Sequence, residues 1–346
     1  MINVKKEGIV FSKSNLGFES SGVLNPAIIQ YGDSIHMFYR AVAKGNYSTI
    51  GYAKFKTPLV VAQRFDCPII FPQFEYEIHG VEDPRIVKID DVFYMSYCGF
   101  DGVNALGALV TSLDLITWEK QGVIVPQLTF EEFNHLTEIK NKLNEKYLRY
   151  NEHERIRERK GKKVLVWDKN VVFFPRRIDG KLYFLHRIKP DIQIVAVKEL
   201  SELTVDFWQN YLLHFQEHIL LEPKHSHEVS YIGAGCPPIE TTSGWLVIYH
   251  SVTDSLNGYI YSASAALLDL KDPHKVIARL PYPLFKPEFD WELVGEVNNV
   301  CFPSGAVVIK DILYIYYGAA DAQIACASLN LSGLLEELKL NTTQDV

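Results

Sequence analysis

The sequence predicts an all-β protein built from five similar β-units, and two observations carry this prediction. The first is a hairpin that recurs five times, in which a tight polar turn leads into a strand that ends in a ring residue. The second is the aromatic content, because the 346 residues include 19 Tyr, 19 Phe and 5 Trp, which favour β-structure. Radial repetition of small antiparallel sheets is typical of a β-propeller. We therefore predict a five-bladed propeller that forms a single domain over residues 1–346.

Each repeat reads as an apolar strand that begins near a proline, then a turn, then a second strand. The prolines are Pro26, Pro84, Pro175, Pro237 and Pro303. The ring residues that close the second strands are Tyr39, Tyr97, His186, Tyr249 and Tyr317, which lie 58, 89, 63 and 68 residues apart. This period exceeds the roughly 40–50 residues of common propeller repeats, so we expect long loops. A two-sheet sandwich with chance similarity between the hairpins is the alternative.

The interval of 89 residues contains a predicted helical insertion between the second and third units, at about 129–163. Spacings of 3, 4 and 4, the period of a helix, relate four of its apolar residues: Leu136, Ile139, Leu143 and Tyr147. We interpret the insertion as a solvated helical segment, with a lid or a subunit contact as the alternative. A second helical pattern at 206–218 is expected on the outside of the fold. A last helix is expected at 332–340, with Ser332 as its N-cap.

Composition restricts the class of function. The net charge of -7 argues against a nucleic-acid partner, which would require a basic face. The cysteines are odd in number and scattered, without a CxxC pair, so neither a disulfide framework nor a metal site is expected. They are Cys67, Cys98, Cys236, Cys301 and Cys326. Reduced thiols and an N-terminus without an apolar leader predict a cytoplasmic protein, and no segment of membrane-spanning length occurs.

The segment 80–97 carries the first candidate for catalysis. It places Glu82, Asp83 and Arg85 at the mouth of a strand, in front of an aromatic hairpin. In a propeller the innermost strands meet at the axis, so a carboxylic acid there can protonate a leaving oxygen if burial raises its pKa. We predict Asp83 as this acid rather than Glu82, because successive side chains of a strand point to opposite faces. A structural ion pair between Asp83 and Arg85 is the alternative.

Cationic side chains occur at equivalent ends of other predicted strands. They are Arg40, Lys169, Arg187 and His250. Together they could bind an anion, with arginine giving fork-shaped contacts to phosphate or carboxylate. Asn25, Asn170 and Gly235 lie near the equivalent openings. Each of these residues alone could instead be a solvated strand end or a satisfied core group, and His186, at a ring position, is expected in the core.

Four segments, in this order, resemble glycoside hydrolase family 130. They are GVEDPRI (80–86), WDKNVVFFP (167–175) with LHR (185–187), IGAGCPPIETTSGWLVIYHSV (232–252) and FPSGAVV with LYIYYGAAD (302–321). The resemblance extends from about Asn25 into the C-terminal region but does not cover the insertion. It implies a five-bladed propeller that acts on β-mannosides, mostly by inverting phosphorolysis and in a minority of members by hydrolysis of β-1,2-linked mannose.

The resemblance also implies roles for single residues. It makes Asp83, in the EDPR motif, the general acid, acting through a sugar hydroxyl. The residues that it places at or near the mannose at the cleavage site are Arg40, Ser48, Arg85, Asn104 and Asp321. Two departures weaken a phosphate site, since Leu106 stands where an arginine is usual and Tyr231 where a lysine is common. Lys169, Arg187 and His250 remain for phosphate.

We therefore predict an inverting β-mannoside phosphorylase that needs no cofactor and uses inorganic phosphate as co-substrate. Its expected partners are a β-mannoside oligosaccharide and phosphate, and assembly into a homo-oligomer is left open. The alternative is an inverting β-mannosidase, in which Glu228 would activate water as the second carboxylate. A non-catalytic sugar-binding propeller would need no acid beside an anion pocket, and a furanosidase would need three carboxylates on separate blades.

Overall fold

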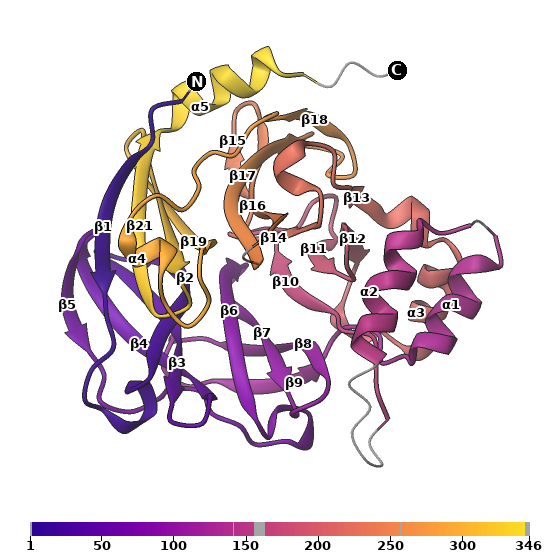
Figure 1. Cartoon of the computed structure of the whole chain (residues 1–346), viewed down its shortest axis with the longest axis horizontal. Coiled ribbons are helices and arrows are strands. Elements are labelled where there is room, and N and C mark those ends of the chain that lie inside the picture. The colour runs from indigo at the N-terminus through magenta and orange to yellow at the C-terminus, as the bar shows by residue number, and fades with distance from the viewer. Residues whose placement is uncertain (1, 141, 156–162, 257, 343–346) are drawn as a thin grey trace.

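The computed structural model describes residues 2–140, 142–155, 163–256 and 258–342. The chain is mostly β, as the sequence predicts, and its strands form antiparallel hairpins that follow one another around the molecule (Figure 1). Five successive groups of strands can be distinguished by their pairing, and we refer to them as units 1 to 5. No helix in the described part of the chain is both long enough and apolar enough to cross a membrane.

Units 1 and 2 are four-stranded antiparallel sheets. Unit 1 consists of β2 (Gly22–Tyr31), β3 (Ser34–Ala43), β4 (Tyr47–Thr57) and β5 (Val60–Arg64). Unit 2 consists of β6 (Gly80–Ile89), β7 (Val92–Phe100), β8 (Ala105–Ser112) and β9 (Glu119–Val123). A single parallel pair, Ser48 with Gly80, joins them into one larger sheet.

Units 3 to 5 repeat this arrangement. Unit 3 consists of β10 (Lys169–Phe173), β11 (Leu182–Arg187), β12 (Ile192–Val197) and β13 (Ile219–Leu221). Unit 4 consists of β14 (Tyr231–Ala234), β15 (Ile239–Thr241), β16 (Gly244–Ser255), β17 (Gly258–Leu268) and β18 (Val276–Arg279). Unit 5 consists of β19 (Cys301–Ile309), β20 (Ile312–Ala319), β21 (Gln323–Asn330) and, from the N-terminus, β1 (Lys5–Phe11).

The polar turns predicted for the hairpins are present. Asp90, Asp179 and Lys310 adopt φ values of 54°, 48° and 57°, the left-handed region that tight hairpin turns require. Each turn leads into the second strand of its unit, which ends beyond the expected ring residue. The turn and the second strand of the predicted hairpin are therefore confirmed in all five units, but in unit 3 the first strand, β10, ends before Pro175 instead of beginning near it.

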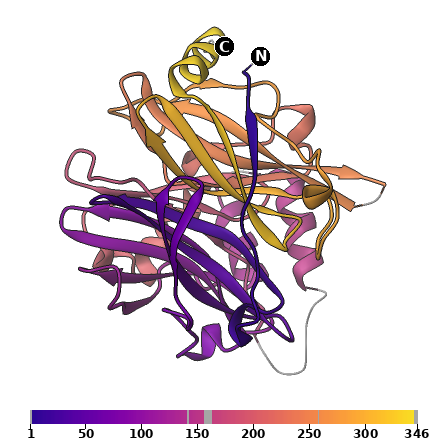
Figure 2. The same ribbon diagram turned by 90° about the vertical axis from the view of Figure 1, so that its left-hand side faces the viewer.

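The first strands of the units form the inside of the molecule. β2 contacts β6, β6 contacts β10, β10 contacts β14, and β19 contacts β2. Five clusters of buried apolar side chains fill the spaces between neighbouring units, including the space between unit 5 and unit 1. The core therefore has no break between the last unit and the first. β1 lies on the outside of unit 5, where it pairs with β21 (Figure 2).

The insertion between units 2 and 3 consists of α1 (Phe130–Glu138) and α2 (Glu145–Arg155). Together with α3 (Val205–Leu213) they cover the outside of the fold beside β12 and β13 (Figure 1). Phe133 and Tyr147 are fully buried and contact Phe215 edge-on, with ring centroids 5.4 Å and 5.3 Å away. The helices are thus correctly predicted, but one face is packed rather than solvated. Ile139, expected in the apolar stripe, is 57% exposed.

The remaining helices are α4 (Asp290–Leu293), before β19, and α5 (Leu331–Leu340) at the C-terminal end. The expected N-cap of α5, Ser332, is wrong. Asn330 caps the helix, because its Oδ1 accepts a hydrogen bond from the backbone N–H of Gly333 at 2.7 Å. The Ser332 hydroxyl instead donates to Asp311 in the turn between β19 and β20.

Candidate active site

A cavity of about 240 Å³ lies where the first strands of the units meet. It brings together five of the residues predicted for the site: Arg40, Asp83, Lys169, Arg187 and Asp321. Asn25 and Asn170, expected near the same openings, also line it. The sequence analysis missed further lining residues: Trp167, Lys189, Tyr261, Val297, Val300 and Phe302. The predicted convergence of equivalent strand ends is therefore present.

Bulges in the first strands aim these side chains into the cavity. Asn25, Asp83 and Asn170 have φ values of 48°, 51° and 55°, and at each of them the strand register shifts against the second strand. A bulge with a left-handed residue redirects the side chains around it. Glu82 and Asp83 consequently both line the cavity, so the expectation that only one of them faces the axis is wrong.

Arg40 contacts two of the carboxylates in the cavity, Glu82 and Asp83. Its Nη2 forms an ion pair with Glu82 Oε1 at 2.8 Å, and its Nη1 lies 3.7 Å from Asp83 Oδ1. Its Nε donates to the hydroxyl of Ser48 at 2.9 Å, so Ser48 orients the guanidinium without lining the cavity. Asn25 Nδ2 donates to Asp83 Oδ1 at 2.7 Å.

The pKa values of the two aspartates of the cavity are shifted in opposite directions from the ordinary value. Burial pushes the pKa of Asp83 upward, but the charges of Arg40, Arg85 and Lys169 and the hydrogen bond from Asn25 outweigh it, so that the pKa lies below its ordinary value. Burial raises the pKa of Asp321 to about 6, with Arg40 opposing the rise. The expectation of a raised pKa at Asp83 is therefore wrong for the protein without substrate.

Three further cations line the cavity, and each lies against an aromatic ring. The Nζ of Lys169 lies 4.6 Å from the ring centroid of Trp167. The guanidinium of Arg187 and the Nζ of Lys189 lie 5.3 Å and 4.5 Å from the ring centroid of Tyr231. Lys169, Arg187 and Lys189 therefore line the same small cavity as the carboxylates, and Lys169 is close enough to lower the pKa of Asp83.

His250 contacts the cavity cation Arg187. It is itself fully buried and does not line the cavity. Its Nε2 lies 3.1 Å from Arg187 Nη1. Burial and the neighbouring arginines hold its pKa well below the ordinary value, so the ring is neutral and accepts the hydrogen bond from Arg187. A Cβ at Gly233 would lie 2.5 Å from the His250 ring and 2.6 Å from Asn170 Nδ2, so the IGAG motif needs glycine at this position.

Like Ser48 and His250, three further predicted residues lie outside the cavity lining. Arg85 is buried, and its Nη1 donates to the backbone carbonyls of Asp83 and Pro84 at 3.2 Å and 2.8 Å, so it does not pair with the Asp83 carboxylate. Asn104 ties the end of the insertion to unit 2: its Nδ2 donates to Lys163 O at 3.1 Å and its Oδ1 accepts from Leu165 N at 2.8 Å. Glu228, the third, is fully buried.

Glu228 belongs to a buried network that recurs in the units. It is fully buried and outside the cavity lining, and it pairs with Arg279 at 2.9 Å and accepts from the Tyr249 hydroxyl at 2.7 Å. The closing ring of every unit contacts a buried carboxylate in this way: Tyr39 with Glu19, Tyr97 with Glu77, His186 with Asp168, Tyr249 with Glu228, and Tyr317 with Glu292. His186 is thus a core residue, as expected.

In units 1, 2, 4 and 5 a cation completes the network. These cations are Arg64, Lys120, Arg279 and Lys6, which come from the outer strands of their units. A sequence signal for this repeat exists, because Glu19, Glu77 and Glu228 each stand three residues before a first strand. Glu228 therefore has the surroundings of a structural carboxylate.

The two departures from the family pattern have different surroundings. Leu106 is buried between units 2 and 3 and lines a separate cavity of about 640 Å³, together with Asp101 and Asn104. Tyr231 lines the candidate cavity itself, and its hydroxyl bonds to that of Tyr261. The tyrosine thus occupies a wall where the family often has a lysine.

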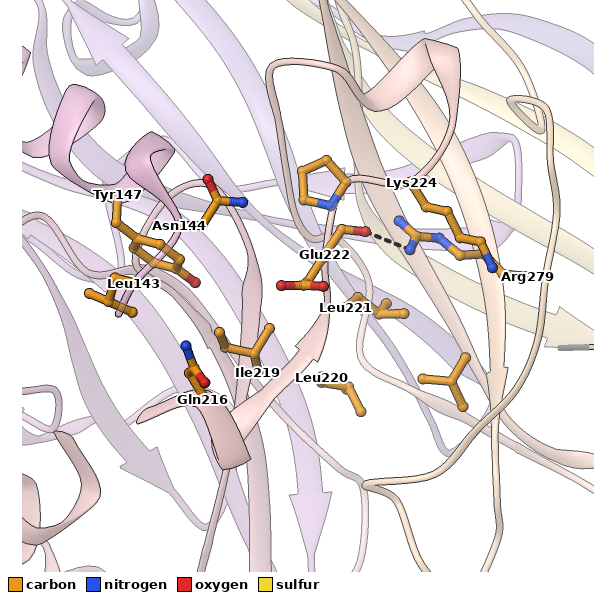
Figure 3. A pocket seen from close by; sticks show the side chains of 12 residues that line it. Leu143, Asn144, Tyr147, Gln216, Ile219, Leu220, Leu221, Glu222, Lys224 and Arg279 are labelled. Atoms are coloured by element: carbon orange, nitrogen blue, oxygen red, sulfur yellow. Dashed lines mark hydrogen bonds between the residues drawn. The ribbon is translucent and has the colours of Figure 1, made fainter. Parts of the chain in front are cut away.

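Two further cavities are also larger than the candidate cavity. One of about 710 Å³ adjoins the candidate cavity and shares Arg40, Val297 and Asp321 with it. The other, of about 550 Å³, lies between α2, β13 and β18, where Tyr147 and Asn144 face Glu222 and Arg279 (Figure 3). Within the described ranges no group of three His, Cys, Asp or Glu side chains is arranged to hold a metal ion.

The family model for β-1,4-mannooligosaccharide phosphorylases matches residues 4–340, nearly the whole chain. The chain belongs to glycoside hydrolase family 130. A 1,2-β-oligomannan phosphorylase of Thermoanaerobacter sp. (strain X514) is 32% identical, over 96% of this chain and 99% of the relative. A β-1,2-mannobiose phosphorylase from the same strain is 35% identical, over 90% of each chain.

Among solved structures, the β-1,2-mannobiose phosphorylase from Listeria innocua in complex with β-1,2-mannobiose superposes with a TM-score of 0.74. It covers 98% of this chain and 100% of its own, at 22% identity, so it supports the fold. A further solved structure, similar at 22% identity and a TM-score of 0.73, represents glycoside hydrolases of this family that target β-1,2-mannosidic linkages in Candida mannan. The prediction of an enzyme from glycoside hydrolase family 130 is confirmed.

Proposed function

We propose that this family 130 enzyme is an inverting β-mannoside phosphorylase, which transfers mannose from the end of a β-mannosyl oligosaccharide to inorganic phosphate. The observation that carries the proposal is the composition of the 240 Å³ cavity, in which Lys169, Arg187 and Lys189 line the same space as Glu82, Asp83 and Asp321. A phosphorylase needs one acid and a cationic pocket, because phosphate brings its own nucleophilic oxygen.

We also infer that the five units are the blades of a β-propeller with the cavity at its axis. The contacts among first strands, the five apolar clusters between neighbouring units and the pairing of β1 with β21 support this inference. The fold likeness to the mannobiose phosphorylase structure supports it further. In this arrangement bulges at equivalent strand positions bring their side chains to one point.

In the proposed reaction, phosphate binds to Lys169, Arg187 and Lys189 and attacks C1 of the mannose. The new C1–O–P bond forms on the face opposite the leaving oxygen, so the β-mannoside yields α-mannose 1-phosphate. The glycosidic C1–O bond breaks, and its oxygen receives a proton from a mannose hydroxyl that Asp83 reprotonates. Arg40 and Asp321 hold the mannose, and His250 keeps Arg187 aimed at the phosphate.

Under this proposal, phosphate binding also raises the pKa of Asp83, so that the carboxyl becomes protonated. Without phosphate, nearby cations hold the pKa of Asp83 below its ordinary value. A phosphate dianion bound to Lys169 would offset one of these cations and add negative charge near Asp83, so the pKa of the carboxyl would rise and it would take up a proton as phosphate binds. The acid would then be ready only when the nucleophile is present.

The substrate of this proposal is an oligosaccharide whose leaving portion extends into the adjoining 710 Å³ cavity. The 240 Å³ cavity is below the roughly 300–1,000 Å³ of typical small-molecule sites, which leaves little room beyond one mannose and phosphate. The adjoining cavity meets the smaller one at Arg40, Val297 and Asp321. The oligomannan and mannobiose phosphorylases among the relatives make β-1,2-linked oligomannosides the preferred candidates.

The alternative of an inverting β-mannosidase is supported by the presence of two further carboxylates in the cavity, Glu82 and Asp321. Either could activate water, whereas Glu228 is enclosed by Arg279 and Tyr249. We favour phosphorolysis, because three cations beside a neutral sugar would otherwise have no substrate charge to bind. A non-catalytic sugar-binding protein is disfavoured for the same reason. A cytoplasmic location and a homo-oligomeric state stay predictions.

The deciding experiment is product analysis with β-1,2- and β-1,4-linked mannobiose and mannotriose, each with and without inorganic phosphate. Phosphate-dependent release of α-mannose 1-phosphate is the expected result. Release of free mannose at the same rate without phosphate would refute the phosphorylase and direct attention to Glu82 and Asp321. No turnover of any mannoside under either condition would favour a binding protein.

A further inference from the structure

Helix α2 of the insertion reaches the cationic wall of the cavity. The ring of Tyr150 packs edge-on against that of Tyr231, with centroids 5.7 Å apart and planes at 84°. The Tyr150 hydroxyl donates to the backbone carbonyl of Ser230 at 2.7 Å, and Lys146 Nζ donates to that of Val229 at 2.8 Å. Two side chains of one helix therefore hold the backbone that leads into β14.

Tyr231 in turn carries two of the cavity cations. Lys189 Nζ lies 4.5 Å from its ring centroid and 5.7 Å from that of Tyr150, so the ammonium sits between two rings. The Arg187 guanidinium lies 5.3 Å from the Tyr231 centroid. Cation–π contacts contribute about 0.5–1 kcal/mol at exposed sites and about 2 kcal/mol or more when water is excluded. The two rings thus help to hold the lysine side chain in place.

We propose that Lys189 is the third cation of the phosphate site and that α2, through Tyr150, positions it. The insertion thereby becomes a working part of the site and helps to set its affinity for phosphate. This inference rests on the proposed phosphorylase function. Lys189 restores a positive charge at the wall where Tyr231 replaces the lysine common in the family.

The arrangement favours this role over a purely structural one. Lys189 lines the same small cavity as Lys169 and Arg187. A phosphate oxygen between these cations would receive ammonium and guanidinium donors together, which are stronger than neutral donors. Tyr150 of the insertion does not line the cavity, and it contacts two residues that do, Tyr231 and Lys189.

The test compares Lys189→Met, which keeps the length of the side chain, with Tyr150→Ala and with the double variant. Michaelis constants are measured for phosphate and for the mannoside in phosphorolysis, and for mannose 1-phosphate in the reverse reaction. We expect Lys189→Met to raise the KM for phosphate at least about tenfold, as the loss of one charged hydrogen bond implies. The KM for the mannoside should stay within about twofold.

Tyr150→Ala should raise the KM for phosphate in the same sense, by about three- to tenfold. The double variant should be no worse than Lys189→Met, because residues that act through one another give non-additive effects. Tyr150→Phe keeps the ring and loses only the bond to Ser230, so it should have the smallest effect. The matched control is Lys181→Met, which removes an exposed lysine of the same unit, outside the cavity.

An unchanged KM for phosphate in Lys189→Met, with phosphate-dependent turnover intact, overturns the inference and leaves the phosphorylase standing. Full additivity of Lys189→Met and Tyr150→Ala overturns the role of α2. If the unmodified enzyme releases mannose without phosphate, the proposed function itself fails. The shift of melting temperature caused by phosphate, in the protein with and without Lys189→Met, then reports whether the cations bind this anion at all.

Discussion

Replacing Glu228 by glutamine should lower stability and leave turnover intact. Glu228 is fully buried, pairs with Arg279 at 2.9 Å and accepts from Tyr249 at 2.7 Å. It also accepts from the backbone N–H groups of Lys224 and His225, both at 2.9 Å. Neutral glutamine leaves the buried guanidinium of Arg279 without its counter-charge, which costs about 3–5 kcal/mol.

This cost translates into a measurable shift of the melting temperature. An unfolding entropy of about 2.1 cal/mol/K per residue gives about 0.7 kcal/mol/K for 346 residues. A loss of about 3–5 kcal/mol therefore corresponds to a drop of about 4–7 °C, read at a fixed scan rate. Ion pairing and hydrogen bonds hold the pKa of Glu228 below its ordinary 4.5 against the effect of burial. Its contribution is thus present above about pH 4.5 and lost in more acidic solution, where the two proteins should converge.

The equivalent change in unit 5, Glu292→Gln, is the matched control. Glu292 is also fully buried, accepts from Tyr317 at 2.6 Å and pairs with Lys6. Both variants should lose comparable stability and keep kcat within about threefold at 25 °C. A loss of turnover of 100-fold or more in Glu228→Gln alone would refute this reasoning and restore Glu228 as a catalytic base.

Three further predictions concern the cavity. Asp83→Asn should lower kcat for phosphorolysis by about 10²–10⁴, the usual contribution of a general acid, in steady-state assays. Asp321→Asn should weaken mannoside binding yet stabilise the fold by up to about 3 kcal/mol in neutral and alkaline solution. Burial raises the pKa of Asp321 to about 6, so the wild-type protein loses stability as pH rises through that value, and melting curves across pH should show the gap. Asn46 lines the adjoining 710 Å³ cavity. Asn46→Gly, which keeps the φ of 60° accessible, should lower kcat/KM for mannotetraose about three- to tenfold and that for mannobiose less than about twofold.

Each of these predictions has an outcome that contradicts it. Unchanged kcat in Asp83→Asn would remove the acid from the mechanism. Equal stabilities of Asp321→Asn and the wild-type protein at about pH 8 would mean that the wild-type carboxylate has other compensation. Equal losses of kcat/KM for mannobiose and mannotetraose in Asn46→Gly would mean that the leaving portion of the oligosaccharide does not occupy the adjoining cavity.

The hairpin pattern was enough to predict five similar units, because turn chemistry and apolar alternation are local signals. Pairing over long sequence distance is not local, and the role of β1 was missed for that reason. Its sequence, KKEGIVF, is charged at one end and interrupted by Gly8, which adopts a φ of 96° within a register shift against β21. The N-cap of α5 was misplaced by two residues because Asn330 and Ser332 are both good capping residues.

The candidate site was predictable as far as strand ends converge. Arg40, Asp83, Lys169, Arg187 and Asp321 followed from equivalent positions and from the family resemblance. Strand alternation predicted that Glu82 would point away from the axis. This was wrong, because the bulge in β6 redirects the side chain. The pKa of Asp83 could not be predicted, because it depends on which cations surround the carboxylate. Lys189 was missed for a similar reason, as only the folded chain brings it over Tyr231.

The pairing of β1 with β21 has a consequence for synthesis on the ribosome. β1 ends at Phe11 and its partner ends at Asn330, so the first strand emerges long before the strand that completes its sheet. At about 5–20 residues per second this wait lasts roughly 15–60 seconds. During that time Lys5, Lys6 and Glu7 keep the unpaired strand polar, which discourages edge-to-edge aggregation. The nascent protein should thus acquire protease resistance only after its final strand leaves the exit tunnel.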